Sequence, residues 1–189
     1  PEHGREAEIL LVSANAALNL SRAEGQRQLC IYSPGHPGAS LHRLTLESQL
    51  RLALQRQELF AVYQPQVSLL TGELVGLEAL VRWRHPERGI VPPGEFIPVA
   101  EQTGLVSAIG DMMLRESCLA LKRLWQAGLP QVPVSVNIPP AQLRRPDFLP
   151  QLMTEVETAG LPPSALEIEI VESMLMADVD TTITLLKAL

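Results

Sequence analysis

The sequence has 189 residues, of which 46% are hydrophobic and 19% charged, as in ordinary folded proteins and unlike disordered chains. Its formal net charge of −6 argues against general affinity for nucleic-acid polymers or anionic membrane surfaces, because both depend on an excess of Lys and Arg. No apolar run approaches the roughly 20 residues of a membrane span.

Cysteine and histidine usage gives no sign of a zinc site. Cys30 and Cys118 lie far apart, which favours two reduced thiols in a cytoplasmic protein over a disulfide framework. The four histidines lack paired metal-ligand spacing, so we expect them on the surface or in loops: His3, His36, His42 and His85. The first residues include neither Met nor a signal pattern, so we expect an excerpt from a longer protein whose upstream part can carry a membrane anchor.

The N-terminal segment is predicted to form a helix and a short strand. Residues 6–24 are rich in Ala and Leu, and Gly25 ends the predicted helix. Residues 28–32 are predicted as a strand. The Pro- and Gly-rich stretch that follows predicts a linker over residues 34–40 and a domain boundary there.

A helix and a hairpin are predicted next. The helix covers about residues 40–57, and its apolar residues share one face. That face carries Leu46, Leu50, Ala53 and Leu54. Strands are predicted over residues 60–67 and 74–83, and the short turn 70–73 between them requires antiparallel neighbours.

The rest of the chain alternates helices and strands. Helices are predicted over residues 105–127, 146–159 and 178–189, and strands over residues 133–138 and 166–171. The first of these helices has a spaced apolar face made of Leu114, Cys118, Leu121 and Trp125. Such alternation is typical of parallel βα units, and the fold class is therefore predicted to be α/β, with an α/β sheet or barrel.

Polar residues interrupt strands that should be apolar. Parallel strands are covered on both faces, and a buried carboxylate costs several kcal/mol unless a partner compensates it. These strands have no matching lysines, so a cation is the expected partner; oxygen ligands suit Mg²⁺ or Mn²⁺ better than zinc. The residues concerned are Glu78, Asn137, Glu167, Glu169 and Glu172.

Each of these residues also has a structural interpretation. Glu78 fits an exposed position on an edge strand, and Asn137 precedes two prolines and fits a loop-shaping role. Glu167 and Glu169 share a face by period two, so at least one of them can be solvated or ion-paired. Arg82 can be an ion-pair partner. Their joint occurrence at successive strand ends favours a site, because barrel active sites lie at the carboxyl ends of strands.

Six sequence blocks occur in order along the chain: Tyr63-Gln64-Pro65, Glu78-Ala79-Leu80-Val81-Arg82-Trp83, Arg84-His85-Pro86, Phe96-Ile97-Pro98 with Ala100-Glu101-Gln102-Thr103-Gly104, Val134-Ser135-Val136-Asn137-Ile138, and Glu169-Ile170-Val171-Glu172-Ser173. These blocks, which span the chain from about Leu41 to the end, resemble the motifs of the EAL family, whose members bind and hydrolyse the bacterial second messenger cyclic di-GMP. The resemblance implies a TIM-like (β/α)₈ barrel with one antiparallel strand, of which this chain contains about the first half.

The resemblance also implies roles for residues. It implies a metal-dependent phosphodiesterase that uses two cations, Mg²⁺ or Mn²⁺, to open cyclic di-GMP to linear pGpG. The implied metal ligands are Glu78, Asn137, Glu169 and Glu172. Glu78 and Glu172 are the implied catalytic residues, and Glu172 also steadies a nearby catalytic loop. The implied substrate-binding residues are Gln64, Leu80 and Arg82, with Leu80 against a guanine and the other two near phosphates.

Further expectations concern the sequence beyond the motifs. Mild departures occur at Pro139 and Val171, where the family commonly has Ser and Thr. The family's Asp-Asp-Phe-Gly loop, a Lys and a later Glu are expected beyond Leu189, so the 189-residue chain alone is expected to be inactive and poorly stable. The alternative function is a non-hydrolysing cyclic di-GMP receptor or regulatory module, or a dimerisation scaffold.

Asn15-Ala16-Ala17-Leu18 and Gly25-Gln26, followed by the predicted strand to Tyr32, resemble in degenerate form the closing helix and strand of a GGDEF domain, the family that synthesises cyclic di-GMP. The expected domains are therefore this GGDEF-like segment over 1–33, the Pro- and Gly-rich linker over 34–40, and the N-terminal half of an EAL domain over 41–189. Expected partners are cyclic di-GMP, an upstream GGDEF-like and sensory domain, and a second copy of the chain through the EAL domain.

Overall fold

The computed structural model describes residues 38–170 of a chain that divides into two units, residues 1–49 and 50–189. The helix predicted over 6–24, the strand over 28–32 and the helix over 178–189 lie outside the described residues, as does Glu172. Helix α2 (Gly38–Gln55) begins two residues before the predicted start. Its predicted apolar residues Leu46, Leu50 and Ala53 are buried, whereas Leu54 is half-buried.

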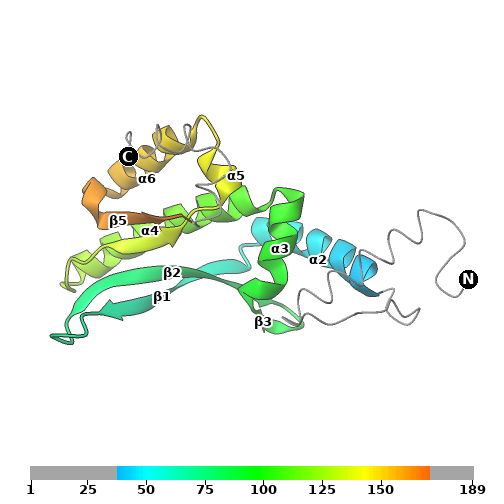
Figure 1. Cartoon of the computed structure of the whole chain (residues 1–189), viewed down its shortest axis with the longest axis horizontal. Helices are drawn as coiled ribbons and strands as arrows, with labels where there is room; N and C mark the ends of the chain where they lie inside the picture. Colours follow the sequence, from blue (N-terminus) through cyan, green and yellow to red (C-terminus); the bar gives the residue numbers. More distant parts are fainter. Residues whose placement is uncertain (1–37, 171–189) are drawn as a thin grey trace, which may run out of the picture. The chain divides into compact units, whose positions relative to one another are not determined.

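The second unit is built on a five-stranded sheet (Figure 1). Its strands are β1 (Leu59–Val67), β2 (Leu74–His85), β3 (Gly89–Val91), β4 (Val134–Asn137) and β5 (Leu166–Glu169). The order is β1-β2-β4-β5, with β3 paired to the end of β2. Strands β1 and β2 are antiparallel, which confirms the predicted hairpin, and β2, β4 and β5 are parallel. The carboxyl ends of these three parallel strands therefore lie at one edge of the sheet.

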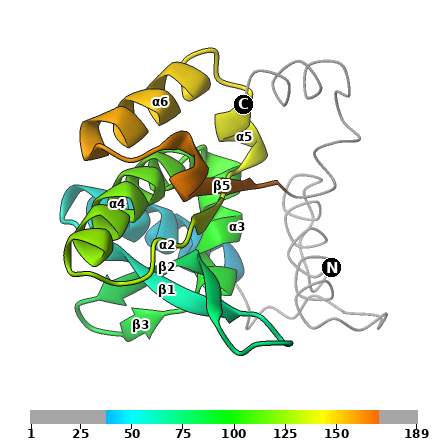
Figure 2. The ribbon, with the colours of Figure 1, turned by 90° about the vertical axis from the view of Figure 1, so that its left-hand side faces the viewer.

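Helices α4 (Val106–Gln126) and α6 (Phe148–Ala159) lie on the same side of this sheet (Figure 2). Helix α4 contacts strands β1 and β4 as well as α6. Three further helical segments are short: α3 (Pro93–Thr103), α5 (Pro140–Leu143) and the 3₁₀ turn η1 (Pro163–Ala165). The sequence prediction did not include α3, α5 or β3. None of the helices within the described residues combines the length and the apolar character that crossing a membrane requires.

The two faces of the sheet differ in polarity because side chains alternate along a strand. On one face, Leu77 and Ala79 of β2 lie beside Val134 and Val136 of β4, and all four are buried. The opposite face carries the polar residues of the same strands. These are Glu78, Ser135, Asn137, Glu167 and Glu169.

Helix α4 buries the predicted stripe of residues. Leu114, Cys118 and Leu121 are each 1% exposed, whereas Trp125 is half-buried. Burial raises the pKa of the Cys118 thiol to about 11, so the thiol is neutral at physiological pH. The helix is one residue shorter at each end than predicted over 105–127. This amphipathic pattern explains why α4 forms the main packing partner of the sheet.

The end of β2 corrects the prediction that His85 lies on the surface. Strand β2 extends two residues beyond the predicted end, and His85 is 5% exposed. Its ring centroid lies 5.3 Å from that of Trp83. The Nδ1 atom accepts hydrogen bonds from the backbone N–H groups of Glu87 and Arg88, at 3.1 and 3.2 Å. His85 is buried because its ring packs against the core while Nδ1 stabilises the turn into β3.

Candidate functional site

Three polar residues meet near the carboxyl ends of β4 and β5. Glu78 lies on β2, Asn137 ends β4, and Glu169 ends β5 directly opposite Asn137 in the strand register. The Asn137 Nδ2–H group donates a hydrogen bond to Glu78 Oε1 over 3.2 Å. Parallel pairing of β2, β4 and β5 thus brings together three of the four residues predicted as metal ligands.

The backbone after β4 is fixed at this edge. Ile138 follows Asn137, is 3% exposed, and donates its N–H to the carbonyl oxygen of Glu169 over 2.9 Å. Pro139 and Pro140 then begin α5. Because a buried side chain and an inter-strand hydrogen bond follow it directly, Asn137 is held at a defined position beside Glu169.

A cavity of about 280 Å³ adjoins these strand ends. Asn137 and Glu169 line it from β4 and β5, and Leu80 and Arg82 line it from β2. The remaining wall comes from α3, α4 and neighbouring segments, and is largely apolar. It consists of Ala79, Val81, Pro93, Ile97, Glu101, Val106, Ile109, Gly110, Met113, Val136, Ile138, Pro139 and Pro140.

The predicted substrate-binding residues occupy different positions around the site. Leu80 and Arg82 are half-buried in the cavity wall, and Arg82 Nη1 donates to the carbonyl oxygen of Val81 over 2.8 Å. Gln64 is exposed on β1, opposite Glu78 in the antiparallel register. The structure therefore places Leu80 and Arg82 in the cavity, whereas Gln64 lies beside Glu78 and outside the cavity lining.

Glu167 differs from Glu169, although the two share a face of β5. Glu167 is exposed, and its Oε2 atom accepts a hydrogen bond from Ser135 Oγ over 3.0 Å. It does not line the cavity. Of this pair, Glu167 is therefore the solvent-facing residue, and Glu169 is the one that lies at the candidate site.

The donor set at the strand ends fits a hard divalent cation. Two carboxylates and one amide converge there, and oxygen ligands of these types suit Mg²⁺ and Mn²⁺. Among residues 46–170, neither Glu78 nor Glu169 forms an ion pair with Lys or Arg, so no protein cation compensates them. Across the described ranges no cluster of three His, Cys, Asp or Glu side chains is arranged to hold a metal. The arrangement is instead two carboxylates with Asn137 between them.

The residues of α3 and α4 that line the cavity were not among the site residues predicted from the sequence. Glu101 and Ile97 come from α3, and Gly110 and Met113 from α4. Prolines at the start of α3 and a left-handed Gly104 at its end, with φ of 74°, are the signals that predict such a helix. A helix predicted at this place in the sequence would have been expected to lie near the carboxyl end of β2.

Comparisons with known proteins agree with this geometry. A family model described as EAL domain matches residues 47–189. The cyclic di-GMP phosphodiesterase NbdA of Pseudomonas aeruginosa is 38% identical over 100% of this chain and 24% of its own length. The chain thus spans about a quarter of the length of this curated relative.

Solved structures show the same likeness. The PaMucR phosphodiesterase in its c-di-GMP complex is 35% identical with a TM-score of 0.73, covering 76% of this chain and 58% of that one. The FimX EAL domain from Pseudomonas aeruginosa bound to c-di-GMP is 27% identical with a TM-score of 0.66, covering 75% and 56%. The predicted TIM-like barrel class is confirmed, and the described strands form part of its sheet. The chain belongs to the EAL domain family.

Proposed function

We propose that the protein is a metal-dependent phosphodiesterase that hydrolyses cyclic di-GMP to linear pGpG. The observation that carries the proposal is the meeting of Glu78, Asn137 and Glu169 at one sheet edge, beside a cavity that Arg82 also lines. Relatives described as cyclic di-GMP phosphodiesterases, and neighbours solved with c-di-GMP, support the same substrate.

The residues around the cavity suit the parts of this substrate. The guanidinium of Arg82 is a planar donor matched to phosphate oxygens. Leu80, with Ile97 and Met113, gives an apolar surface for a guanine base. Gln64 on the neighbouring strand supplies an amide donor for a phosphate. These residues would hold the phosphodiester across the carboxyl edge of the sheet.

Hydrolysis adds one water across one phosphodiester, breaking a P–O3′ bond and leaving a free 3′ hydroxyl and a 5′ phosphate. Divalent cations, Mg²⁺ or Mn²⁺ and two in a complete site, supply a water activated for attack and neutralise charge on the phosphate. Glu78, Asn137 and Glu169 would hold a cation, and the proposal adds Glu172, which lies outside the described residues. Glu78 and Glu172 are the catalytic residues of this proposal.

Metal removal tests the proposed reaction directly. The full-length product of the gene, treated with EDTA, is expected to lose hydrolysis of cyclic di-GMP, and added Mg²⁺ or Mn²⁺ is expected to restore it. Chromatography that separates cyclic di-GMP from linear pGpG measures both states. Undiminished turnover in EDTA would contradict the metal assignment, and tight binding of cyclic di-GMP without cleavage in Mn²⁺ would instead indicate a receptor.

A further inference from the structure

A fully buried glutamine lies on the segment that follows Asn137. Gln142 belongs to the single turn α5, and its side chain is 0% exposed. Its Nε2–H group donates to Asp111 Oδ1 over 2.7 Å, whereas Oε1 has no hydrogen-bond partner among the residues the structure describes. A buried amide with an unsatisfied oxygen costs free energy. An apolar residue would fill this core position at lower cost, so the glutamine needs another explanation.

The Gln142 amide lies directly against Gly110 of α4. A Cβ atom added to Gly110 would overlap Oε1 of Gln142 and lie 2.7 Å from its Cδ. Gly110 itself lines the cavity beside Asn137 and Glu169. A larger residue at position 110 must therefore displace the glutamine. The close approach of helix α4 to α5 depends on this glycine.

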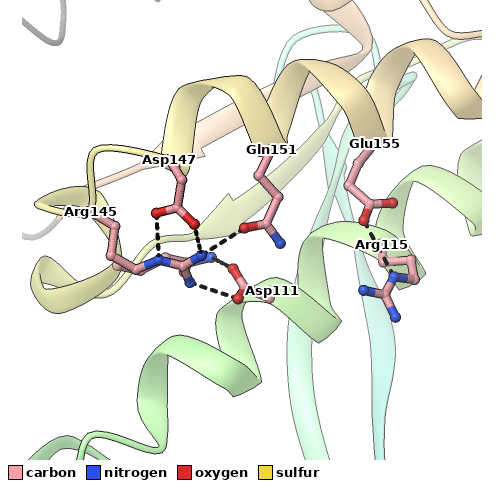
Figure 3. Close-up of polar contacts among 7 residues, drawn as sticks. Asp111, Arg115, Arg145, Asp147, Gln151 and Glu155 are labelled. Atoms are coloured by element: carbon pink, nitrogen blue, oxygen red, sulfur yellow. Dashed lines mark hydrogen bonds and ion pairs between the residues drawn. The ribbon is translucent and has the colours of Figure 1, made fainter.

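The carboxylate of Asp111 accepts hydrogen bonds from Gln142 and from Arg145, and Figure 3 shows the contact with Arg145. Its Oδ1 atom accepts from Gln142, and its Oδ2 atom accepts from Arg145 Nη1 over 2.7 Å. Arg145 is held in turn by Asp147, through Nε at 3.1 Å and Nη2 at 2.8 Å, and by Gln151 Oε1 at 2.8 Å. The hydrogen bonds from Arg145 lower the pKa of Asp147, which keeps that carboxylate charged. The position of the Gln142 amide is thus fixed by a chain of charged contacts.

The link from Gln142 back to Asn137 is short and stiff. Only residues 138–141 separate them, and two of these are prolines, whose φ angles are fixed. The Gln142 N–H donates to the carbonyl oxygen of Pro139 over 3.0 Å, which closes the turn. Pro139 and Pro140 also line the cavity. A displacement of Gln142 therefore moves the segment that begins at Asn137.

We propose that Gln142 is a positioning residue, which holds α5 on Gly110 and Asp111 of α4 and so sets the position of the Asn137 amide between Glu78 and Glu169. This role rests on the proposed function, in which Asn137 is a cation ligand. Groups that orient metal ligands commonly change metal affinity or activity by about 10–100-fold when they are removed. Gln142 leaves its Oε1 atom without a hydrogen bond among the described residues, and the proposed role explains why this residue is nevertheless present.

Two substitutions test the role in the full-length protein. Gln142→Leu keeps most of the volume and removes the hydrogen bond to Asp111, and Gly110→Ala displaces the amide without removing any polar group. Each is expected to weaken Mn²⁺ binding, measured without substrate by electron paramagnetic resonance of free Mn²⁺, by about tenfold or more. The kcat for cyclic di-GMP should fall similarly, with little change in KM, because Asn137 holds a cation and does not bind the substrate.

The double variant Gln142→Ala/Gly110→Ala distinguishes displacement of the Gln142 amide from a general destabilisation of α4. In a Gln142→Ala background the added Cβ of Gly110→Ala meets no amide, so it should weaken Mn²⁺ binding little further. Contacting residues that act through one another are expected to be non-additive in this way. Full additivity of the two losses would overturn the proposal.

A matched control lies on α4, the helix that also carries Gly110 and Asp111. Arg115 Nε of α4 lies 3.3 Å from Glu155 Oε1 of α6, so this pair joins α4 to α6 as the Arg145 contacts do (Figure 3). Arg115→Ala should leave Mn²⁺ affinity and kcat unchanged. If it reduces them as much as Gln142→Leu does, general helix packing explains the effect and the positioning role is wrong.

The outcomes for the two proposals differ. A parent protein that hydrolyses cyclic di-GMP, with unchanged Mn²⁺ affinity in Gln142→Leu and Gly110→Ala, overturns the positioning role alone. A parent that binds Mn²⁺ more tightly than both variants and does not cleave cyclic di-GMP overturns the proposed function and supports the positioning role. A parent that neither binds Mn²⁺ nor cleaves cyclic di-GMP overturns both.

Discussion

Replacing Glu78 by alanine is expected to reduce cyclic di-GMP hydrolysis by more than about 100-fold, while the protein stays folded. Removing a group that only orients a metal ligand already lowers metal affinity or activity by about 10–100-fold. Removing the ligand itself should therefore lower activity further. Glu78 is half-buried within β2, and its Oε1 atom accepts a hydrogen bond from Asn137 Nδ2. The measurement is kcat/KM with Mn²⁺, together with circular dichroism of the variant.

Two further variants distinguish the effect of the negative charge of Glu78 from the effect of its hydrogen bond. Glu78→Gln keeps an oxygen that can accept from Asn137 Nδ2 and loses the negative charge, so it should lose nearly as much activity as the alanine variant. Glu167→Ala is the matched control, because Glu167 is exposed on the same face two residues from Glu169 and outside the cavity lining. Full activity in Glu78→Gln would show that the hydrogen bond matters and the charge does not.

The largest effect on stability is expected from Trp83. Its side chain is 0% exposed, its ring meets Phe96 edge-on with centroids 5.7 Å apart, and its Nε1–H donates to Glu58 Oε2 over 3.2 Å. Truncation of such a ring leaves a cavity, so Trp83→Ala should lower the free energy of unfolding by about 3–5 kcal/mol.

Urea unfolding followed by circular dichroism measures this loss against Leu70→Ala. Leu70 is 97% exposed in the hairpin turn, and its removal should change stability little. A Trp83→Ala protein as stable as the Leu70→Ala control would contradict the assignment of Trp83 to the core.

The sequence predicted the regular parts of the fold because their patterns are strong and local. The predicted turn over residues 70–73 is too short for anything except an antiparallel hairpin, and the structure pairs β1 and β2 in this way. The helical period from Leu114 to Leu121 predicted the buried face of α4. Both signals depend on neighbouring residues only.

Other elements depend on tertiary contacts, which the hydrophobic periodicity of the sequence does not reveal. Helix α3 was not predicted because Pro98 interrupts its interior, although the prolines at its start and Gly104 after its end are helix-boundary signals. Helix α5 is a single turn whose position depends on Gln142 packing against Gly110. His85 was expected on the surface or in a loop because it lacks a paired metal-ligand spacing, yet aromatic packing and a turn bury it.

The site was predictable at the level of which strands contribute, and less so at the level of geometry. Polar residues within β2 and at the ends of β4 and β5 indicated Glu78, Asn137 and Glu169, because active sites of barrels lie toward the carboxyl ends of parallel strands. The pattern did not separate Glu167 from Glu169, since both share a face. Only the hydrogen bond from Ser135 and the cavity lining distinguish them.

Mn²⁺ binding to the full-length protein and to its Glu169→Gln and Glu167→Gln variants tests most directly whether these strand ends form a cation site. Electron paramagnetic resonance of free Mn²⁺, without substrate, gives each dissociation constant. We predict that Glu169→Gln weakens Mn²⁺ binding by about tenfold or more and that Glu167→Gln leaves it unchanged. Equal Mn²⁺ affinity in all three proteins would contradict the assignment of Glu169, and with it the site built on Glu78 and Asn137.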